Sequence, residues 1–129
     1  KRSFEKAAEI DSTYSASYTL LLDIANIEGN AFAAKKYCKK LLESDPENIN
    51  LLLNLSSALY YEEEFNQALQ VNDRIIELNN TIPEAYLNKA YSYIKLGDLN
   101  NAQLFLEKGK LLNPNLTDVI RLDELLKDE

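Results

Sequence analysis

An internal repeat with a period of 34 residues constrains this chain more than any other feature. Ala34, Ala68 and Ala102 lie at that spacing, and Gly29 and Gly97 are two periods apart. Chance matches would scatter over many offsets, whereas several independent positions agree here on one. Units of about 20–50 residues that recur in this way stack so that each buries its apolar face against its neighbours.

Each unit is predicted to contain two helices. In the third unit, apolar residues follow a helical spacing from Ala85 to Leu96, and Gly97 then ends the helix. A second helix is expected over residues 99–112, and Pro114 cannot continue it. The recurring alanines lack bulk, which lets the two helices approach closely. These patterns predict an all-α fold.

A single domain is expected over residues 1-129, divided by the period into successive segments. We expect repeats at 15-48, 49-82 and 83-116, preceded by the second helix of a truncated repeat at 1-14 and followed by a capping helix at 117-129. Phe4 falls in register with Cys38, which supports the assignment of the first segment. The chain begins with Lys1 rather than Met, and we expect it to be a fragment of a longer array.

Charge and composition exclude several functional classes. The net charge of −7 repels phosphate backbones, so nucleic acid is not expected as a ligand. No apolar run approaches the roughly 18 residues needed to span a bilayer, and no direct membrane contact is expected. The basic stripe on one predicted helix is interpreted as a solvated convex face rather than an anion site. It comprises Lys35, Lys36, Lys39 and Lys40.

No catalytic, cofactor-binding or metal-binding motif is recognisable. The chain lacks histidine, the residue best suited to proton transfer near neutral pH and the commonest metal ligand. The acidic residues do not follow the spacing of a calcium loop, and the three glycines are isolated. The single cysteine, Cys38, is interpreted as a buried structural thiol. We therefore expect a non-catalytic protein without a cofactor, located in the cytoplasm, although targeting segments can lie outside this chain.

The third unit resembles the tetratricopeptide repeat family. Residues typical of that family occur at Tyr86, Ala90, Tyr93, Gly97, Asp98, Ala102 and Pro114. The chain departs from the family pattern at Lys89, where leucine is typical, and at Glu63, which replaces a turn glycine. Lys89 and Gly109 indicate looser packing in the third unit. The resemblance implies a right-handed superhelical α-solenoid whose concave face is lined by the first helix of each unit.

The resemblance also implies which residues line that concave groove. The expected peptide-binding residues are Thr19, Asp23, Asn26, Leu53, Asn54, Tyr60, Tyr61, Leu87, Asn88, Tyr91 and Lys95. The last helix could extend the floor through Arg121, Leu122 and Leu125.

Two groups within this set indicate a peptide ligand. Asn54 and Asn88 are one repeat apart, and an amide can both donate to and accept from an extended backbone. The alternative is that both are ordinary solvated asparagines. Tyr60, Tyr61 and Tyr91 offer the rigid amphipathic area that is enriched at interfaces, although some of these rings could instead pack between helices.

One subfamily binds the carboxylate tail of cytosolic chaperones through basic and amide side chains. The corresponding positions here are Thr19, Asp23, Asn54, Glu84 and Asn88, of which only Asn54 matches. Two of them are acidic and would repel a C-terminal carboxylate. We therefore expect a neutral, apolar or mildly basic partner rather than a chaperone tail.

The leading functional hypothesis is a scaffold that binds an extended protein segment in the groove. A second hypothesis is a structural segment that self-associates through its terminal helices, using Phe4, Ala7 and Ala8 or the last helix. A third is the targeting module of an enzyme whose other parts lie outside this sequence. A fold of this kind does not by itself choose among them.

Overall fold

The computed structural model describes the backbone of residues 2–127 and the side chains of residues 15–127. Within these residues the secondary structure is entirely helical, which confirms the predicted all-α class. The helices are α1 (Arg2–Glu28), α2 (Ala31–Ser44), α3 (Ile49–Tyr61), α4 (Phe65–Leu78), α5 (Pro83–Lys95), α6 (Leu99–Leu112) and α7 (Thr117–Lys127). In this part of the chain, no helix is long and apolar enough to cross a bilayer.

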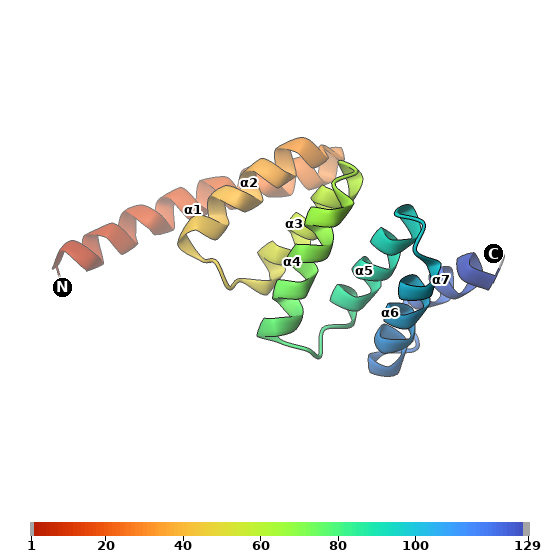
Figure 1. Ribbon diagram of the computed structural model, residues 1–129. Helices are drawn as coiled ribbons and strands as arrows, with labels where there is room; N and C mark the ends of the chain where they lie inside the picture. Colours follow the sequence, from red (N-terminus) through yellow and green to blue (C-terminus); the bar gives the residue numbers. More distant parts are fainter. Residues whose placement is uncertain (1, 128–129) are drawn as a thin grey trace.

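The helices form a solenoid of successive antiparallel pairs. Helices α1 and α2, α3 and α4, and α5 and α6 lie side by side, and α7 follows at the end opposite the N-terminus (Figure 1). Each second helix also packs against the first helix of the next pair: α2 on α3, α4 on α5 and α6 on α7. Helix α5 contacts both α3 and α7, so these first helices share one side of the array.

Helix α1 differs from the expectation for the N-terminal segment. A break was expected between residues 14 and 15, but the backbone runs as one helix from Arg2 to Glu28. The reason is local, because Ser12 stands where Pro46 and Pro114 end the later units, and serine does not prevent a helix from continuing. The side chains of Phe4, Ala7 and Ala8, on which predicted self-association depended, lie outside the described side chains.

The turn inside each repeat has the same backbone geometry. Gly29, Glu63 and Gly97 occupy equivalent positions with φ of 69°, 63° and 81°, the left-handed conformation that glycine adopts at low cost. The following residue closes each turn with a backbone hydrogen bond, from Asn30 N to the Ala25 carbonyl, from Glu64 N to the Leu59 carbonyl and from Asp98 N to the Tyr93 carbonyl. This is the Schellman arrangement of helix C-termini, and Glu63 adopts it without being glycine.

The core follows the small residues of the repeat. Ala34, Ala68 and Ala102 are all buried, as the period predicts. Cys38 is fully buried in the cluster that joins α1, α2 and α3, which confirms its interpretation as a structural thiol. Burial raises the pKa of this thiol to about 12, so Cys38 remains protonated at neutral pH and is a poor nucleophile.

Lys89 is buried, and the expectation of looser packing around it is wrong. Its side chain is only 8% exposed. The ammonium group pairs with the Asp73 carboxylate on α4 and lies 4.0 Å from the centre of the Phe105 ring on α6. Both interactions compensate for the loss of hydration of a buried charge. Lys89 of α5 thus links α4 of the second repeat to α6 of the third repeat.

The basic stripe on α2 is only partly a solvated face. Lys36 and Lys39 are exposed, but the Lys35 side chain is 17% exposed and pairs with Glu62 and Glu64. The hydrogen bond from Lys35 lowers the pKa of the Glu64 carboxyl group. These two ion pairs join α2 to the turn after α3.

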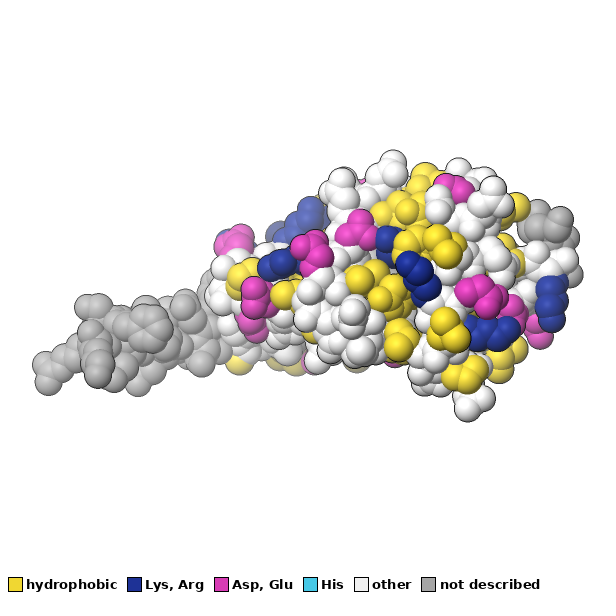
Figure 2. All heavy atoms as spheres, turned by 60° about the horizontal axis from the view of Figure 1, so that its bottom comes forward, with side chains coloured by type: hydrophobic (Ala, Val, Ile, Leu, Met, Phe, Trp, Pro, Cys, Tyr) yellow, Lys and Arg dark blue, Asp and Glu magenta, His cyan; other side chains and the backbone are white. Residues whose placement is uncertain are grey.

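The surface carries both signs of charge and scattered apolar side chains. Figure 2 shows hydrophobic side chains in several groups on one face, with acidic and basic side chains between them. At the C-terminal end, α7 buries Val119 and Leu122 against the array, while Asp118 and Lys127 lie at its ends. Helix α7 therefore covers the last repeat with one apolar face, as expected of a cap.

Asp73→Asn is expected to lower the free energy of unfolding by about 1–2 kcal/mol, because the buried Lys89 ammonium loses its carboxylate partner. Replacing Lys89 by leucine in the same variant should restore most of that loss. Asp123→Asn is the control, since it breaks an ion pair whose lysine, Lys110, is 41% exposed and can be hydrated, so its effect should be smaller. Urea unfolding measures all of these. Equal effects of the two asparagine variants would contradict the structural role of Lys89.

Glu63→Gly is expected to stabilise the chain by about 0.5–1 kcal/mol, because it relieves a side chain held in the left-handed region. Gly97→Ala should do the opposite at the equivalent turn. No atom lies within 4 Å of the added Cβ, so only the backbone conformation is tested. Thermal unfolding followed by circular dichroism measures both variants. If Glu63→Gly were less stable, the interactions of the Glu63 side chain would stabilise the fold by more than its left-handed backbone destabilises it.

Candidate functional site

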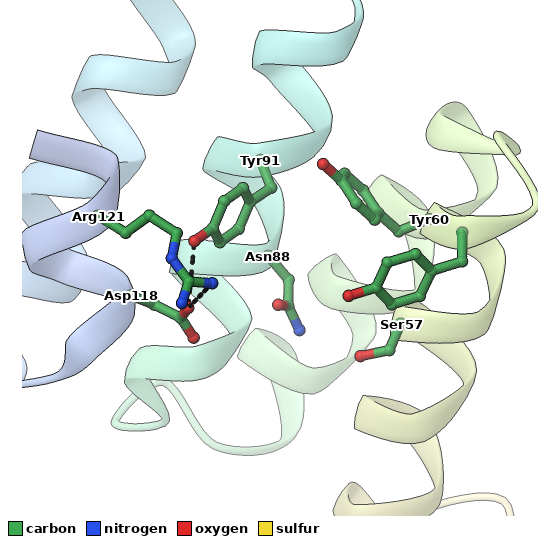
Figure 3. A pocket seen from close by; sticks show the side chains of 7 residues that line it. Ser57, Tyr60, Asn88, Tyr91, Asp118 and Arg121 are labelled. Atoms are coloured by element: carbon green, nitrogen blue, oxygen red, sulfur yellow. Dashed lines mark hydrogen bonds and ion pairs between the residues drawn. The ribbon is translucent and has the colours of Figure 1, made fainter. Parts of the chain in front are cut away.

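A cavity of about 330 Å³ lies among three of the first helices, α3, α5 and α7. Side chains from α7 and α3 face each other across it, with α5 behind them (Figure 3). Its lining consists of Ser57, Tyr60 and Tyr61 from α3, Asn88 and Tyr91 from α5, and Asp118 and Arg121 from α7. The volume lies at the lower end of the range for ligand pockets, about 300–1,000 Å³.

One side of this cavity is aromatic. The Tyr60 ring lies edge-on to Tyr61 at 5.4 Å and to Tyr91 at 6.0 Å between ring centroids. Tyr60 also contacts Phe65 of α4 at 5.5 Å. Edge-to-face pairs of this kind fix the rings relative to one another. The three tyrosines therefore form a continuous wall, whose members touch each other and leave no gap for a ligand ring between them.

The other end of the cavity is polar. The Tyr91 hydroxyl donates a hydrogen bond to Asp118 Oδ1 at 3.1 Å, and Arg121 Nη1 lies 3.7 Å from the same oxygen (Figure 3). Burial, and then the Asp118 carboxylate, raise the pKa of Tyr91 to about 12. Burial also raises the pKa of Tyr60. Both phenols are neutral hydrogen-bonding groups at physiological pH, and Arg121 and Asp118 offset each other's charge.

A second cavity of about 120 Å³ lies between the first repeat and α3. It is lined in part by Asn26, Asn54, Ser57 and Tyr61. Ser57 and Tyr61 also line the larger cavity, so the two hollows adjoin along α3. Together they extend across the first helices from α1 to α7.

The two asparagines of the expected ladder are not equivalent. Asn54 accepts a hydrogen bond from Asn26 Nδ2 at 3.1 Å and donates one to the Asn50 carbonyl at 2.8 Å. Asn88 lines the larger cavity, and its side-chain amide makes no hydrogen bond within the described part of the chain. Its amide is therefore the more available of the two for a ligand.

Most of the expected groove residues lie along these hollows, but several do not. Tyr60, Tyr61, Asn88 and Tyr91 line the larger cavity, and Asn26 and Asn54 line the smaller one. Thr19, Asp23 and Lys95 are exposed and line neither cavity. Leu53 is half-buried and packs against the cluster of Leu52, Ile75 and Ala85.

Leu87 does not line the groove, and its expected role there is wrong. It is fully buried in the core between α5, α6 and α7. Gly109 of α6 explains this position, because a Cβ atom there would lie 2.7 Å from Leu87 Cδ2. The earlier repeats have Leu41 and Ile75 at the position of Gly109. The missing side chain leaves a space that Leu87 fills.

Two charged residues of the site come from α7. Asp118 was not expected to line the groove, and Arg121 was expected only as an extension of its floor. Asp118 lies one repeat after Glu84, a first-turn residue of α5, so continuing the register into the capping helix would have found it. Among the described residues, no group of histidine, cysteine or acidic side chains could hold a metal ion.

The model of the tetratricopeptide repeat family matches residues 15–48 and 83–116, just over half of the chain. The chain therefore belongs to the tetratricopeptide repeat family. The helical pairs, the left-handed turns and the groove along the first helices all agree with this assignment.

Solved structures of the same fold include domains from plants and animals. The TPR domain of Arabidopsis OM64 superposes with a TM-score of 0.83 at 15% identity, over 92% of this chain and 98% of that chain. The second TPR domain of human RPAP3, solved in complex with the HSP70 peptide SGPTIEEVD, superposes with a TM-score of 0.80 at 19% identity, over 92% and 99%. At these identities the likeness establishes the fold alone.

A curated relative matches a shorter part of the sequence. The UDP-N-acetylglucosamine–peptide N-acetylglucosaminyltransferase of Caenorhabditis elegans is 36% identical over 74 residues. The match covers 57% of this chain and only 6% of the enzyme. It therefore transfers no catalytic activity to this chain.

The Tyr91 phenol is expected to make stability depend on pH in the alkaline range. A tyrosine in the unfolded chain ionises at about pH 10, whereas the folded pKa is about 12. Between these values the folded state keeps a proton that the unfolded state has lost. The contribution of Tyr91 to stability is thus complete below the lower value and is lost as the pH rises toward the upper one.

Tyr91→Phe should therefore reduce the fall in unfolding free energy between pH 10 and pH 12, as measured by urea unfolding at a series of pH values. Identical slopes for the variant and the natural chain would show that the phenol is not shielded from solvent in this way.

Proposed function

We propose that this chain binds an extended segment of a partner protein along the concave side of its first helices. The larger cavity is the main support, because it joins an aromatic wall to an unpaired amide at Asn88 and to a charge-balanced end at Asp118 and Arg121. Pockets with apolar walls and a few convergent polar groups are the usual form of peptide and ligand sites.

The chemistry of the lining suits a peptide backbone. The Asn88 amide can donate to a backbone carbonyl and accept from a backbone N–H, and Ser57 adds a hydroxyl from the neighbouring helix α3. The tyrosine wall would contact apolar side chains of the ligand while the phenols remain neutral. An affinity on the order of micromolar is expected for a short segment bound through such dispersed contacts.

The charges of the groove favour a neutral or mildly basic segment over a chaperone tail. Arg121 is the only cation among the residues that line the two cavities, and Asp118 offsets it. Asp23 and Glu84, at positions that some relatives use to hold a terminal carboxylate, are exposed acids. A peptide that ends in several carboxylates would meet repulsion here.

The proposal is tested by selecting 12-residue peptides that bind the full chain from a random display library. Their affinities are then measured by fluorescence anisotropy. Asn88→Ala is expected to weaken binding about tenfold, because it leaves ligand backbone groups without a partner. Asn54→Ala should have a smaller effect, since the Asn54 amide is already bonded to Asn26 and Asn50.

The matched control is Asn66→Ala, which removes the same side chain from an exposed position on α4 and should leave the affinity unchanged. The peptide SGPTIEEVD, which the human RPAP3 domain binds, serves as the chaperone-tail probe and is expected not to bind. If the affinity of the selected peptides fell equally in Asn66→Ala and Asn88→Ala, the binding site would lie outside the larger cavity.

A further inference from the structure

The Asp118 carboxylate, at the polar end of the larger cavity, is only partly occupied by its neighbours. Both of its contacts fall on one oxygen, because the Tyr91 hydroxyl donates to Oδ1 at 3.1 Å and Arg121 Nη1 lies 3.7 Å from the same atom (Figure 3). Within the described side chains, the other oxygen, Oδ2, accepts no hydrogen bond and forms no ion pair. Asp118 can therefore still bind a donor group that enters the cavity.

Arg121 is a weak partner for this carboxylate. Its side chain is 63% exposed, and its distance of 3.7 Å from Asp118 exceeds the roughly 2.7–2.9 Å of a charge-assisted hydrogen bond. An exposed ion pair of this kind contributes little, because both groups stay hydrated and the long side chain keeps its freedom to move. The Arg121 guanidinium can thus move into solvent and leave the carboxylate to a ligand.

The groups around Asp118 also suit a cation. The Asn88 amide oxygen lines the same cavity, and the Tyr91 oxygen, whose proton is donated to Asp118, can only accept a further hydrogen bond. The tyrosine wall lies beside them, and aromatic rings attract cations. Glu84 lies one helical turn before Asn88 on the same face of α5; it is exposed and forms no ion pair within the described part of the chain. Its carboxylate adds negative charge on this side of α5.

We propose that the larger cavity binds an arginine side chain of the partner segment, an inference that rests on the groove function proposed above. A guanidinium carries five N–H donors and no acceptor, in a planar fork that matches the two oxygens of a carboxylate. It is also less strongly hydrated than an ammonium group and packs readily on aromatic rings. The guanidinium would bond Asp118 and the Asn88 oxygen, while the aliphatic part of the side chain contacts the tyrosine wall.

Arg121 takes the part of a competitor in this arrangement. It occupies the same carboxylate that the arginine of the ligand would use, and it must leave Asp118 before the ligand can form a bidentate pair. A neutral residue at this position would remove the competition and the repulsion between two like charges. This role is opposite to that of a basic residue that holds a ligand carboxylate, so the sign of its mutational effect distinguishes the two.

The test begins with 12-residue peptides selected on the full chain from a random display library. The selected peptides are expected to share an arginine at one position. Selection on the Asp118→Asn variant should lose this enrichment. Asp123→Asn is the matched control, since it removes the same charge from the same helix at a residue that pairs with Lys110 and does not line the cavity. Selection on this control should still enrich arginine.

Fluorescence anisotropy with one selected peptide then isolates the guanidinium. Replacing its arginine by citrulline, which has nearly the same shape but no charge, should weaken binding to the natural chain about tenfold and leave binding to Asp118→Asn unchanged. Lysine at the same position should bind more weakly than arginine, because it cannot form the bidentate pair. Arg121→Gln should strengthen binding of the arginine peptide about twofold to fivefold and leave the citrulline peptide unaffected.

Several results would overturn the arginine site. These are equal affinities of the arginine and citrulline peptides for the natural chain, equal affinities of the arginine and lysine peptides, or loss of the arginine preference in Asp123→Asn. Weaker binding of both peptides to Arg121→Gln would show that Arg121 itself holds the ligand. Peptides that lack arginine but lose affinity in Asn88→Ala would exclude the arginine site and leave the groove function intact. Failure to select any peptide would count against both.

Discussion

The contact between the second helix of one repeat and the first helix of the next holds this molecule together. Small residues at Ala34, Ala68 and Ala102 allow the helices of each repeat to pack closely, and the next helix then covers the remaining apolar side. Because each contact joins only neighbours, stability is distributed along the array rather than concentrated in one core. The groove is a product of this stacking, since it exists only where successive first helices lie side by side.

Much of this architecture could be predicted from sequence, because a periodic pattern reports directly on which positions are buried. The turns at Gly29 and Gly97, the buried Cys38 and the α7 cap all follow from register. Predictions failed where a single residue departed from the pattern. Lys89 is buried because Asp73 and Phe105 stabilise its charge, which no spacing rule reveals.

Less of the candidate site than of the fold could be predicted from the sequence, because single residues and helix angles decide which side chains reach the cavity. The family resemblance implied Tyr60, Asn88 and Tyr91, but it could not show that the absence of a side chain at Gly109 lets Leu87 enter the core. Which residues converge on a cavity depends on the angle between neighbouring helices, and that angle is set by packing details distant in sequence. Asp118 is found only if the register of the repeats is extended into α7, which follows the third helical pair.

The walls of the larger cavity come from α3 and α7, with α5 between them, so its width is a measure of how strongly the array bends. The junction of α4 with α5, where Lys89 meets Asp73, lies within that bend but outside the cavity. A change at this ion pair is therefore expected to alter the width of the cavity without changing any residue that lines it. Because the stacked helices form an extended coil, a segment that bridged α3 and α7, as proposed above, would also make the array more resistant to mechanical extension.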